Sequence, residues 1–236
     1  MPPAARGVFR DRLPAAERYA ELLATEGVVR GLIGPREAPR LWERHLLNCA
    51  VLADGIAEGA DVCDIGSGAG LPGMVLAVRR PDLTVTLVEP LLRRATFLNE
   101  AVTELGLSNV EVVRARAEEL HGTRSFSVVT SRAVAPLDRL LRWSLPLVRQ
   151  GGFVLAMKGA SAAVEVDEAG RMIREHGAGP PVIETYGETV VQPPTTVVRV
   201  EAIRPVRISL ETRDRGAGGR RPTRAKRTRS PRKKGR

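Results

Sequence analysis

The sequence predicts an α/β protein with a mostly parallel sheet that is covered by helices on both faces. Three observations support this fold class. From residue 61 onward, short apolar runs alternate with helix-like segments, which is the pattern of parallel strands joined by crossover helices. A glycine-rich turn follows the first run, as at the opening of a nucleotide-binding βαβ unit. Two last apolar runs, joined by Gln192-Pro193-Pro194, indicate an antiparallel strand pair.

The first part of the chain predicts helices. Residues 13–33 form a helix with a mixed apolar stripe, ended by Gly31 and by Gly34-Pro35. Residues 40–54 form a second helix, whose buried face has the i, i+4, i+7, i+11 spacing of Trp42, Leu46, Cys49 and Ala53. We therefore expect residues 1–58 to be an N-terminal helical cap.

Residues 59–207 are predicted to form the main domain. The predicted strands are 62–65, 83–88, 110–113, 126–130 and 152–157, followed by the pair 181–191 and 195–203. The predicted helices are 71–80, 91–105, 136–148 and 164–176. Pro72 is tolerated in the first turn of a helix, whereas Pro146 should disturb the last turn of its helix. The sheet should therefore have about seven strands.

The positive charge of the chain is concentrated at its C-terminal end. Of the 37 Lys and Arg residues, 12 lie in residues 212–236 beside one Asp, so residues 1–211 hold 25 basic and 26 acidic side chains. Such a segment cannot bury a core. We predict that residues 208–236 form a disordered tail and that Arg220 to Arg236 bind RNA phosphates. A solubilising extension without a specific function is the alternative.

Composition also limits the cellular setting. No apolar run approaches the ~20 residues of a membrane span, and the N-terminus lacks the apolar core of a secretory signal. Cys49 and Cys63 do not have metal-ligand spacing, and buried reduced thiols are the simplest interpretation. We expect a monomeric cytoplasmic protein without a metal site.

Polar residues follow each of the five predicted strands. They are Asp64-Ile65-Gly66, Glu89-Pro90, Arg114 to Glu119, Ser131-Arg132 and Lys158-Gly159. Ligands of open α/β sheets bind outside the carboxyl ends of the strands. The sequence therefore predicts a binding site at this edge.

Two classes of nucleotide cofactor fit the glycine turn. Residues 68–73 match G-x-G-x-x-G, as in the NAD-dependent oxidoreductases. Asp64, however, would oppose a pyrophosphate, whereas the amino group and sulfonium of S-adenosylmethionine would favour its charge; a helix cap is the structural alternative for Asp64. Glu89, 23 residues after Gly66, suits the ribose of either cofactor. The turn therefore favours S-adenosylmethionine and leaves NAD open.

Taken together, these motifs resemble a known family. They are residues 64–73, Val88-Glu89-Pro90, Arg93-Arg94, Phe97-Leu98, residues 116–119, Ser131-Arg132-Ala133, Met157-Lys158-Gly159 and the upstream residues 42–47. Their order is similar to that in the bacterial small-subunit ribosomal RNA guanine-N7 methyltransferases, also called methyltransferase G or glucose-inhibited division protein B. The resemblance covers roughly residues 10–205. It departs at Asn48, where aspartate is common in the family, so we assign Asn48 no catalytic role.

The resemblance implies a class I, Rossmann-like methyltransferase fold. It implies that S-adenosylmethionine methylates N7 of guanine 527 in the 530 loop of 16S RNA, so 16S RNA or the 30S subunit is the expected partner. The family's cofactor contacts fall on Gly66, Leu71, Ala117, Glu118 and Arg132. To these we add Asp64, Gly68, Gly70 and Glu89. Methylation of another RNA, or an RNA-binding protein with a vestigial pocket, remains an alternative.

Guanine N7 has an in-plane lone pair and no proton, so we expect residues that position the base and no general base. Arg132 is predicted to order the cofactor and the base edge, with Lys158 at the RNA-facing rim. Arg44 and His45 are further candidates, although spacing alone favours a buried structural His45. A basic rim for RNA is predicted from Arg93, Arg94, Arg114 and Arg116.

Overall fold

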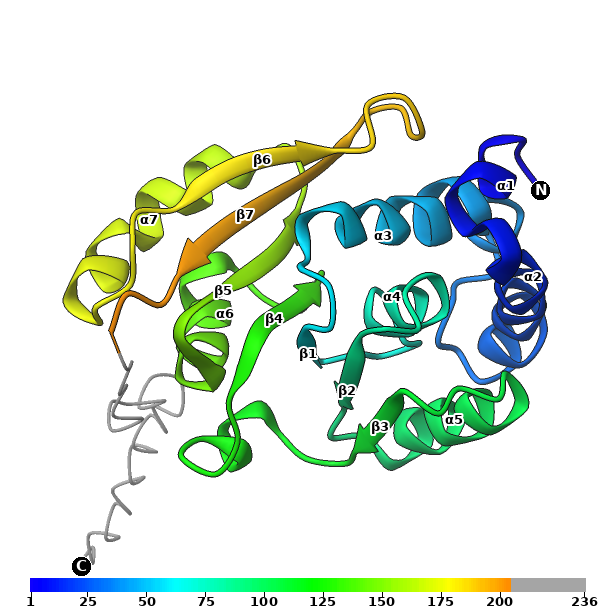
Figure 1. Cartoon of the computed structure of the whole chain (residues 1–236), viewed down its shortest axis with the longest axis horizontal. Helices are drawn as coiled ribbons and strands as arrows, with labels where there is room; N and C mark the ends of the chain where they lie inside the picture. The colour runs from blue at the N-terminus through cyan, green and yellow to red at the C-terminus, as the bar shows by residue number, and fades with distance from the viewer. Residues whose placement is uncertain (205–236) are drawn as a thin grey trace, which may run out of the picture.

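The computed structural model describes residues 1–204, except the side chains of residues 174 and 175. Within these residues, seven strands form one sheet in the order β3-β2-β1-β4-β5-β7-β6 (Figure 1). The first five strands of this order are parallel, and β7 runs antiparallel to both of its neighbours. The strands are β1 Asp61–Ile65, β2 Thr84–Val88, β3 Val110–Val113, β4 Phe126–Arg132, β5 Val148–Lys158, β6 Val182–Tyr186 and β7 Thr195–Glu201. The predicted seven-stranded, mostly parallel sheet with a C-terminal antiparallel pair is confirmed.

Helices connect the parallel strands, as crossover connections require. The α-helices are α1 Ala4–Phe9, α2 Leu13–Leu22, α3 Asn48–Ala50, α4 Gly73–Arg79, α5 Leu92–Glu104, α6 Leu137–Ser144 and α7 Ala162–Glu175. The 3-10 and π-helical segments are η1 Arg10–Arg12, η2 Leu23–Gly27, η3 Ala38–Arg40, η4 Leu41–Leu47, η5 Val51–Gly55, η6 Ala117–Leu120 and η7 Leu145–Leu147. Within residues 1–204, none of the helices combines the length and the apolar character that crossing a bilayer requires.

The two faces of the sheet have separate apolar cores. Because strand side chains alternate between faces, Val62 packs toward α4 and the N-terminal helices, while Cys63 and Ile65 pack toward α6 and α7. Figure 1 shows these two groups of helices on opposite sides of the sheet. The N-terminal helices share a core with α4 and α5, and the predicted boundary between residues 58 and 59 stays a prediction.

Several element boundaries differ from the sequence prediction. The helix predicted over 136–148 is α-helical only to Ser144, because Pro146 has no N–H to donate and the chain tightens into η7. Consequently, β5 begins at Val148 and not at residue 152. Residues 187–194 form the loop between β6 and β7, and α1 was not predicted. The predicted tail over 208–236, and the end of the predicted domain over 59–207, lie outside the described residues.

Candidate active site

The glycine turn after β1 lies where the connections of the sheet diverge. The chain passes from β1 to β2 and β3 on one side, and later to β4 and β5 on the other, which is the place where open α/β sheets bind ligands. Gly66, Gly68 and Gly70 all have left-handed φ angles, of 66°, 59° and 94°. The N–H groups of Gly66 and Ser67 donate to the carbonyl of Val88 at 2.8 and 3.1 Å. These bonds fix the turn against the end of β2.

Asp64 has a different place from the one expected. Its side chain is fully buried and does not line a cavity. Oδ2 accepts a hydrogen bond from the Gly73 N–H at 3.0 Å, while Oδ1 has no partner among the described residues. Burial, with a further contribution from the charge of Glu89, raises the pKa of Asp64 to about 7. Asp64 thus connects β1 to the start of α4 instead of presenting its charge to a ligand.

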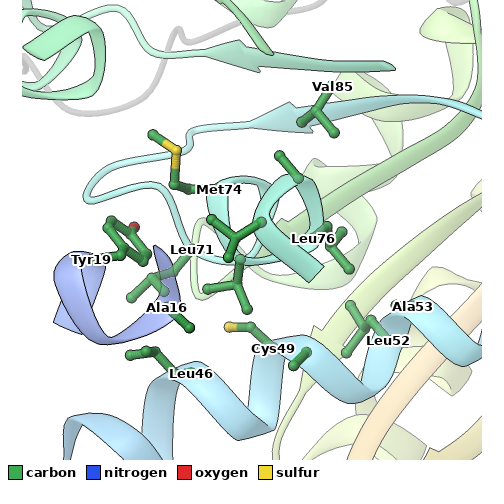
Figure 2. Close-up of a cluster of buried hydrophobic side chains, with 14 of the residues drawn as sticks. Ala16, Tyr19, Leu46, Cys49, Leu52, Ala53, Leu71, Met74, Leu76 and Val85 are labelled. Atoms are coloured by element: carbon green, nitrogen blue, oxygen red, sulfur yellow. The ribbon is translucent and has the colours of Figure 1, made fainter. Parts of the chain in front are cut away.

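Tyr19 of α2 completes the turn from the other side. Its buried hydroxyl donates to the carbonyl of Ala69 at 2.5 Å. A Cβ atom on Gly70 would lie only 2.6 Å from this hydroxyl. Figure 2 shows Tyr19 beside Leu71 and Met74, above the helix that carries Cys49. Tyr19 lies in the helix predicted over residues 13–33, and a hydroxyl on the buried face of that helix, which needs a partner, is the sequence signal for this contact.

Glu89 holds the outer part of the turn. Its side chain is almost fully buried, and it accepts hydrogen bonds from the N–H groups of Gly68 (Oε2, 2.9 Å) and Leu91 (Oε1, 3.0 Å). Arg94 approaches Oε2 at 3.7 Å. Arg94 therefore lies beside the glycine turn, and its predicted contact with RNA stays a prediction.

A cavity of about 550 Å³ opens over this turn, and we call it the cofactor cavity, after the cofactor that the sequence predicts at this edge of the sheet. Its walls come from the glycine turn with Leu71, from Glu89 to Leu91 with Arg94, from Arg132 to Val134, and from Leu32, Ile33 and His45. Of the predicted cofactor residues, Gly66, Gly68, Leu71, Glu89 and Arg132 line it. Gly70 lies beneath it, and Ala117 and Glu118 begin η6 outside the lining.

A second cavity, of about 670 Å³, adjoins the first, and we call it the acceptor cavity, after the methyl acceptor that the resemblance predicts. Both cavities are lined by Arg132, Ala133 and Val134, so this segment is the wall between them. Ala133 has a left-handed φ of 53°, a conformation that costs a non-glycine residue about 1 kcal/mol and that clusters at functional sites. Asn48 lines the acceptor cavity, although sequence analysis gave it no role.

Lys158 and Glu165 brace the wall from the acceptor side. Lys158 Nζ donates to Glu165 Oε2 at 2.7 Å and to the Ala135 carbonyl at 2.8 Å. Glu165 Oε2 also accepts the Leu137 N–H at 2.9 Å. The Lys158 side chain is only 9% exposed. It lines the acceptor cavity as a cation paired with Glu165, and its place at an RNA-facing rim stays a prediction.

Arg132 joins the wall to the N-terminal helices. One terminal nitrogen of its guanidinium lies 2.7 Å from His45 Nδ1, and the other donates to Cys49 Sγ at 3.3 Å. His45 Nε2 lies 3.0 Å from Glu37 Oε2, and Arg44 bonds both oxygens of Glu37. His45 therefore lines the cofactor cavity, whereas Arg44 lines neither cavity.

The fold and the two adjoining cavities define a class I methyltransferase. A family model described as GidB, rRNA small subunit methyltransferase G, matches residues 12–189. The chain belongs to this family.

Relatives agree with this family assignment, and a solved structure shares the fold. The ribosomal RNA small subunit methyltransferase G of Nocardioides sp. is 61% identical over 210 residues, which cover 89% of this chain and 84% of the relative. The Thermobifida fusca protein of the same name is 56% identical over 219 residues, covering 93% and 91%. A solved tRNA methyltransferase from Aquifex aeolicus has a TM-score of 0.52 at 13% identity, covering 67% of this chain and 69% of that chain. This last likeness shows the shared fold.

The expected cofactor class is confirmed by the methyltransferase family of the chain: the methyl donor is S-adenosylmethionine. The residues at the turn fit this molecule. Glu89 presents a carboxylate to the cavity, as ribose hydroxyls require, and the space over Gly68 is open, since a Cβ there would meet only the Gly66 carbonyl, at 3.8 Å. The predicted preference over NAD is thus supported by the family, whereas the buried Asp64 lies outside the cavity lining.

Proposed function

We propose that this protein methylates N7 of a guanine in 16S ribosomal RNA, the nucleotide that family resemblance gives as 527. The observation that supports this proposal is the shared wall of Arg132, Ala133 and Val134 between a cofactor cavity and an acceptor cavity. A methyl group carried on a sulfonium is transferred by in-line displacement, so donor and acceptor must meet across one short gap. The two adjoining cavities satisfy this requirement.

Arg132 is suited to hold a guanine edge. Contacts to His45 and Cys49 occupy its two terminal nitrogens only in part, and a guanidinium has five N–H donors. The remaining donors match O6 of guanine, an acceptor beside N7. Arg132 thereby orients the base while the N7 lone pair stays free.

The acceptor cavity also fits the charge of the product. N7-methylguanine carries a positive charge, and Glu165 and Glu168 both line this cavity. The pKa of Glu165 is lowered, because its bonds with Lys158 and Ser161 outweigh its burial, so it stays ionised. At the end of β4 the sequence reads Ser131-Arg132-Ala133 and lacks the Asn/Asp-Pro-Pro-aromatic run that grips exocyclic amines. N7 therefore suits this site better than an amino nitrogen does.

Three arginines suit contact with RNA phosphates around the cavities. Arg93, Arg114 and Arg116 are exposed, near the C-terminal ends of β2 and β3. RNA enzymes that read sequence mostly act on splayed, unstacked bases. We therefore expect the target loop to present an unstacked guanine while these arginines hold its backbone. The protein is expected to act as a monomer.

The proposal is tested by labelled methyl transfer to 30S subunits and to naked 16S RNA, both from a strain that lacks this modification. We expect N7-methylguanine at a single nucleotide, identified by mass spectrometry of nuclease fragments. In the same assay, Arg132→Ala should lose at least about 100-fold in methyl transfer, as expected for a lost positioning group. A different modified base would refute the acceptor, and unchanged transfer and cofactor affinity in the variant would remove Arg132 from the site.

A further inference from the structure

The environment of His45 determines which of its ring nitrogens carries the proton. A guanidinium can only donate hydrogen bonds, so His45 Nδ1, 2.7 Å from Arg132, must be an unprotonated acceptor. In a neutral imidazole the proton then lies on Nε2, which points at Glu37 Oε2 across 3.0 Å. Nε2 therefore donates to the carboxylate, and the three side chains form one directed chain of hydrogen bonds.

We propose that Glu37 is a positioning residue for Arg132 and acts through His45. By accepting the Nε2 proton, Glu37 keeps the Nδ1 lone pair directed at the guanidinium, which then stays at the wall between the two cavities. The inference rests on the proposed function, in which Arg132 orients the target guanine. Glu37 itself lines neither cavity, so its influence on the reaction passes through His45.

The surrounding charges favour this arrangement. His45 faces Arg132 of β4 and Glu37 of the turn before η3, with Arg44 as its neighbour on η4. Burial and the Arg132 charge lower the pKa of His45, whereas Glu37 opposes this shift. The bond from His45, together with the charge of Arg44, lowers the pKa of Glu37 and keeps it an acceptor. A neutral ring between a guanidinium and a carboxylate is the state that these charges favour.

The position of Glu37 makes the arrangement dependent on the N-terminal part of the chain. Glu37 and His45 both precede β1, while Arg132 ends β4, so the bond between His45 and Arg132 spans 87 residues. Cys49 Sγ accepts from the other terminal nitrogen of Arg132. Two residues of one helical segment thus fix the guanidinium plane, and Glu37 fixes the orientation of one of them.

Nitrogen-15 NMR of imidazole-labelled protein tests the proposal directly. Wild type should show His45 as the neutral tautomer protonated on Nε2. In Glu37→Ala the His45 ring should be free to turn away from Arg132, so that both tautomers are populated. Glu37→Gln should keep the wild-type tautomer, because its amide oxygen still accepts the Nε2 proton. Glu43→Ala is the matched control, since Glu43 is exposed on η4, the segment that carries His45. A wild-type tautomer in Glu37→Ala would overturn the proposal.

Methyl transfer provides the second readout. Glu37→Ala should lose about 10-fold to 100-fold in turnover with near-normal cofactor affinity, as expected when a catalytic contact is misplaced, and Glu37→Gln should restore most of it. The rate of methyl transfer should fall at low pH, where His45 becomes protonated. Loss of the Glu37 charge lowers the pKa of His45, so this fall should occur at a lower pH in Glu37→Gln than in wild type. Equal losses of turnover in Glu37→Ala and Glu43→Ala, or an unchanged pH dependence of methyl transfer in Glu37→Gln, would reject the positioning role. If wild type fails to methylate guanine, the proposed function fails, while the NMR result still decides the His45 arrangement.

Discussion

The backbone N–H of Gly73 donates to Asp64 Oδ2 across 3.0 Å, and this bond holds the first residue of α4 against the end of β1. The approach is so close that only glycine fits at this position. A Cβ atom there would lie 2.4 Å from Leu87 Cδ2 and 2.7 Å from Asp64 Cβ. The glycine at the end of the turn is therefore a packing requirement, distinct from the left-handed glycines before it.

Gly73→Ala should lower the free energy of unfolding by roughly 1–3 kcal/mol, the usual cost of overpacking. Urea denaturation followed by circular dichroism measures it. Gly7→Ala is the matched control, because a Cβ on Gly7 of α1 meets nothing within 4 Å. That variant should be neutral or more stable, by about 0.5–1 kcal/mol. Equal stability of the two variants would contradict the packing argument.

Asp64 should give stability an unusual dependence on pH. Its pKa is about 7 in the folded protein against 3.8 for an ordinary Asp, so between these values the folded state binds the proton more tightly than the unfolded state does. Its contribution to stability is complete below about pH 4 and is lost as pH rises to about 7. The stability difference between wild type and Asp64→Asn should follow this decline in urea titrations from pH 4 to 8. A difference that is constant with pH would show an ordinary pKa.

Glu89→Gln should weaken S-adenosylmethionine binding by about 10-fold to 100-fold, since an amide NH₂ would face the N–H groups of Gly68 or Leu91 and a charged acceptor would be lost. Isothermal titration calorimetry with S-adenosylmethionine measures the change. Glu17→Gln, at an exposed position of α2, should bind like wild type. Retained affinity in Glu89→Gln would remove this carboxylate from the cofactor site.

Tyr19→Phe removes one oxygen atom and leaves the Ala69 carbonyl without its partner at the buried turn. We expect a loss of about 1–3 kcal/mol in unfolding free energy, together with weaker cofactor binding. Thermal unfolding with and without S-adenosylmethionine reports both effects. Tyr186→Phe, on strand β6, is the control and should leave cofactor affinity unchanged. If Tyr19→Phe and Tyr186→Phe bind S-adenosylmethionine with equal affinity, Tyr19 stabilises the fold but has no effect on the cofactor turn.

The positive charge of residues 212–236 leads to a prediction about the salt dependence of RNA binding. Deleting residues 212–236 removes 12 basic residues and one acidic residue. If these residues bind RNA phosphates, the slope of log affinity against log salt should become less steep. Filter binding to the substrate RNA between 50 and 200 mM salt provides the measurement. An unchanged slope would rule out a phosphate-binding role.

Sequence patterns predicted the sheet well because its strands are locally encoded. The alternation of apolar strands with amphipathic helices fixes the parallel topology. The break at Gly66, next to Glu89 at the following strand end, predicted a turn that lines a cavity in the structure. Arg132 could be predicted to lie near it because it ends β4 at the same edge of the sheet.

The contacts that brace the site were not predictable in the same way. Lys158 looks like a solvated strand end, and only the fold brings Glu165 of α7 against it. The sequence suggests that Asp64 is an acid facing a ligand, whereas in the structure the start of α4 packs against it. Nothing local in the sequence shows that Glu37 points to His45. These contacts depend on how helices far apart in sequence pack together, which periodicity does not encode.

The bond from Tyr19 to Ala69 links two processes that would otherwise be separate. Because α2 supplies a hydrogen bond to the cofactor turn, any opening of α2 also loosens the cofactor site. By thermodynamic reciprocity, bound S-adenosylmethionine must then suppress the opening of α2. Slower hydrogen exchange in Leu13–Leu22 on cofactor binding is the corresponding signature. An N-terminal helix without direct cofactor contact would thus report whether the methyl donor is bound.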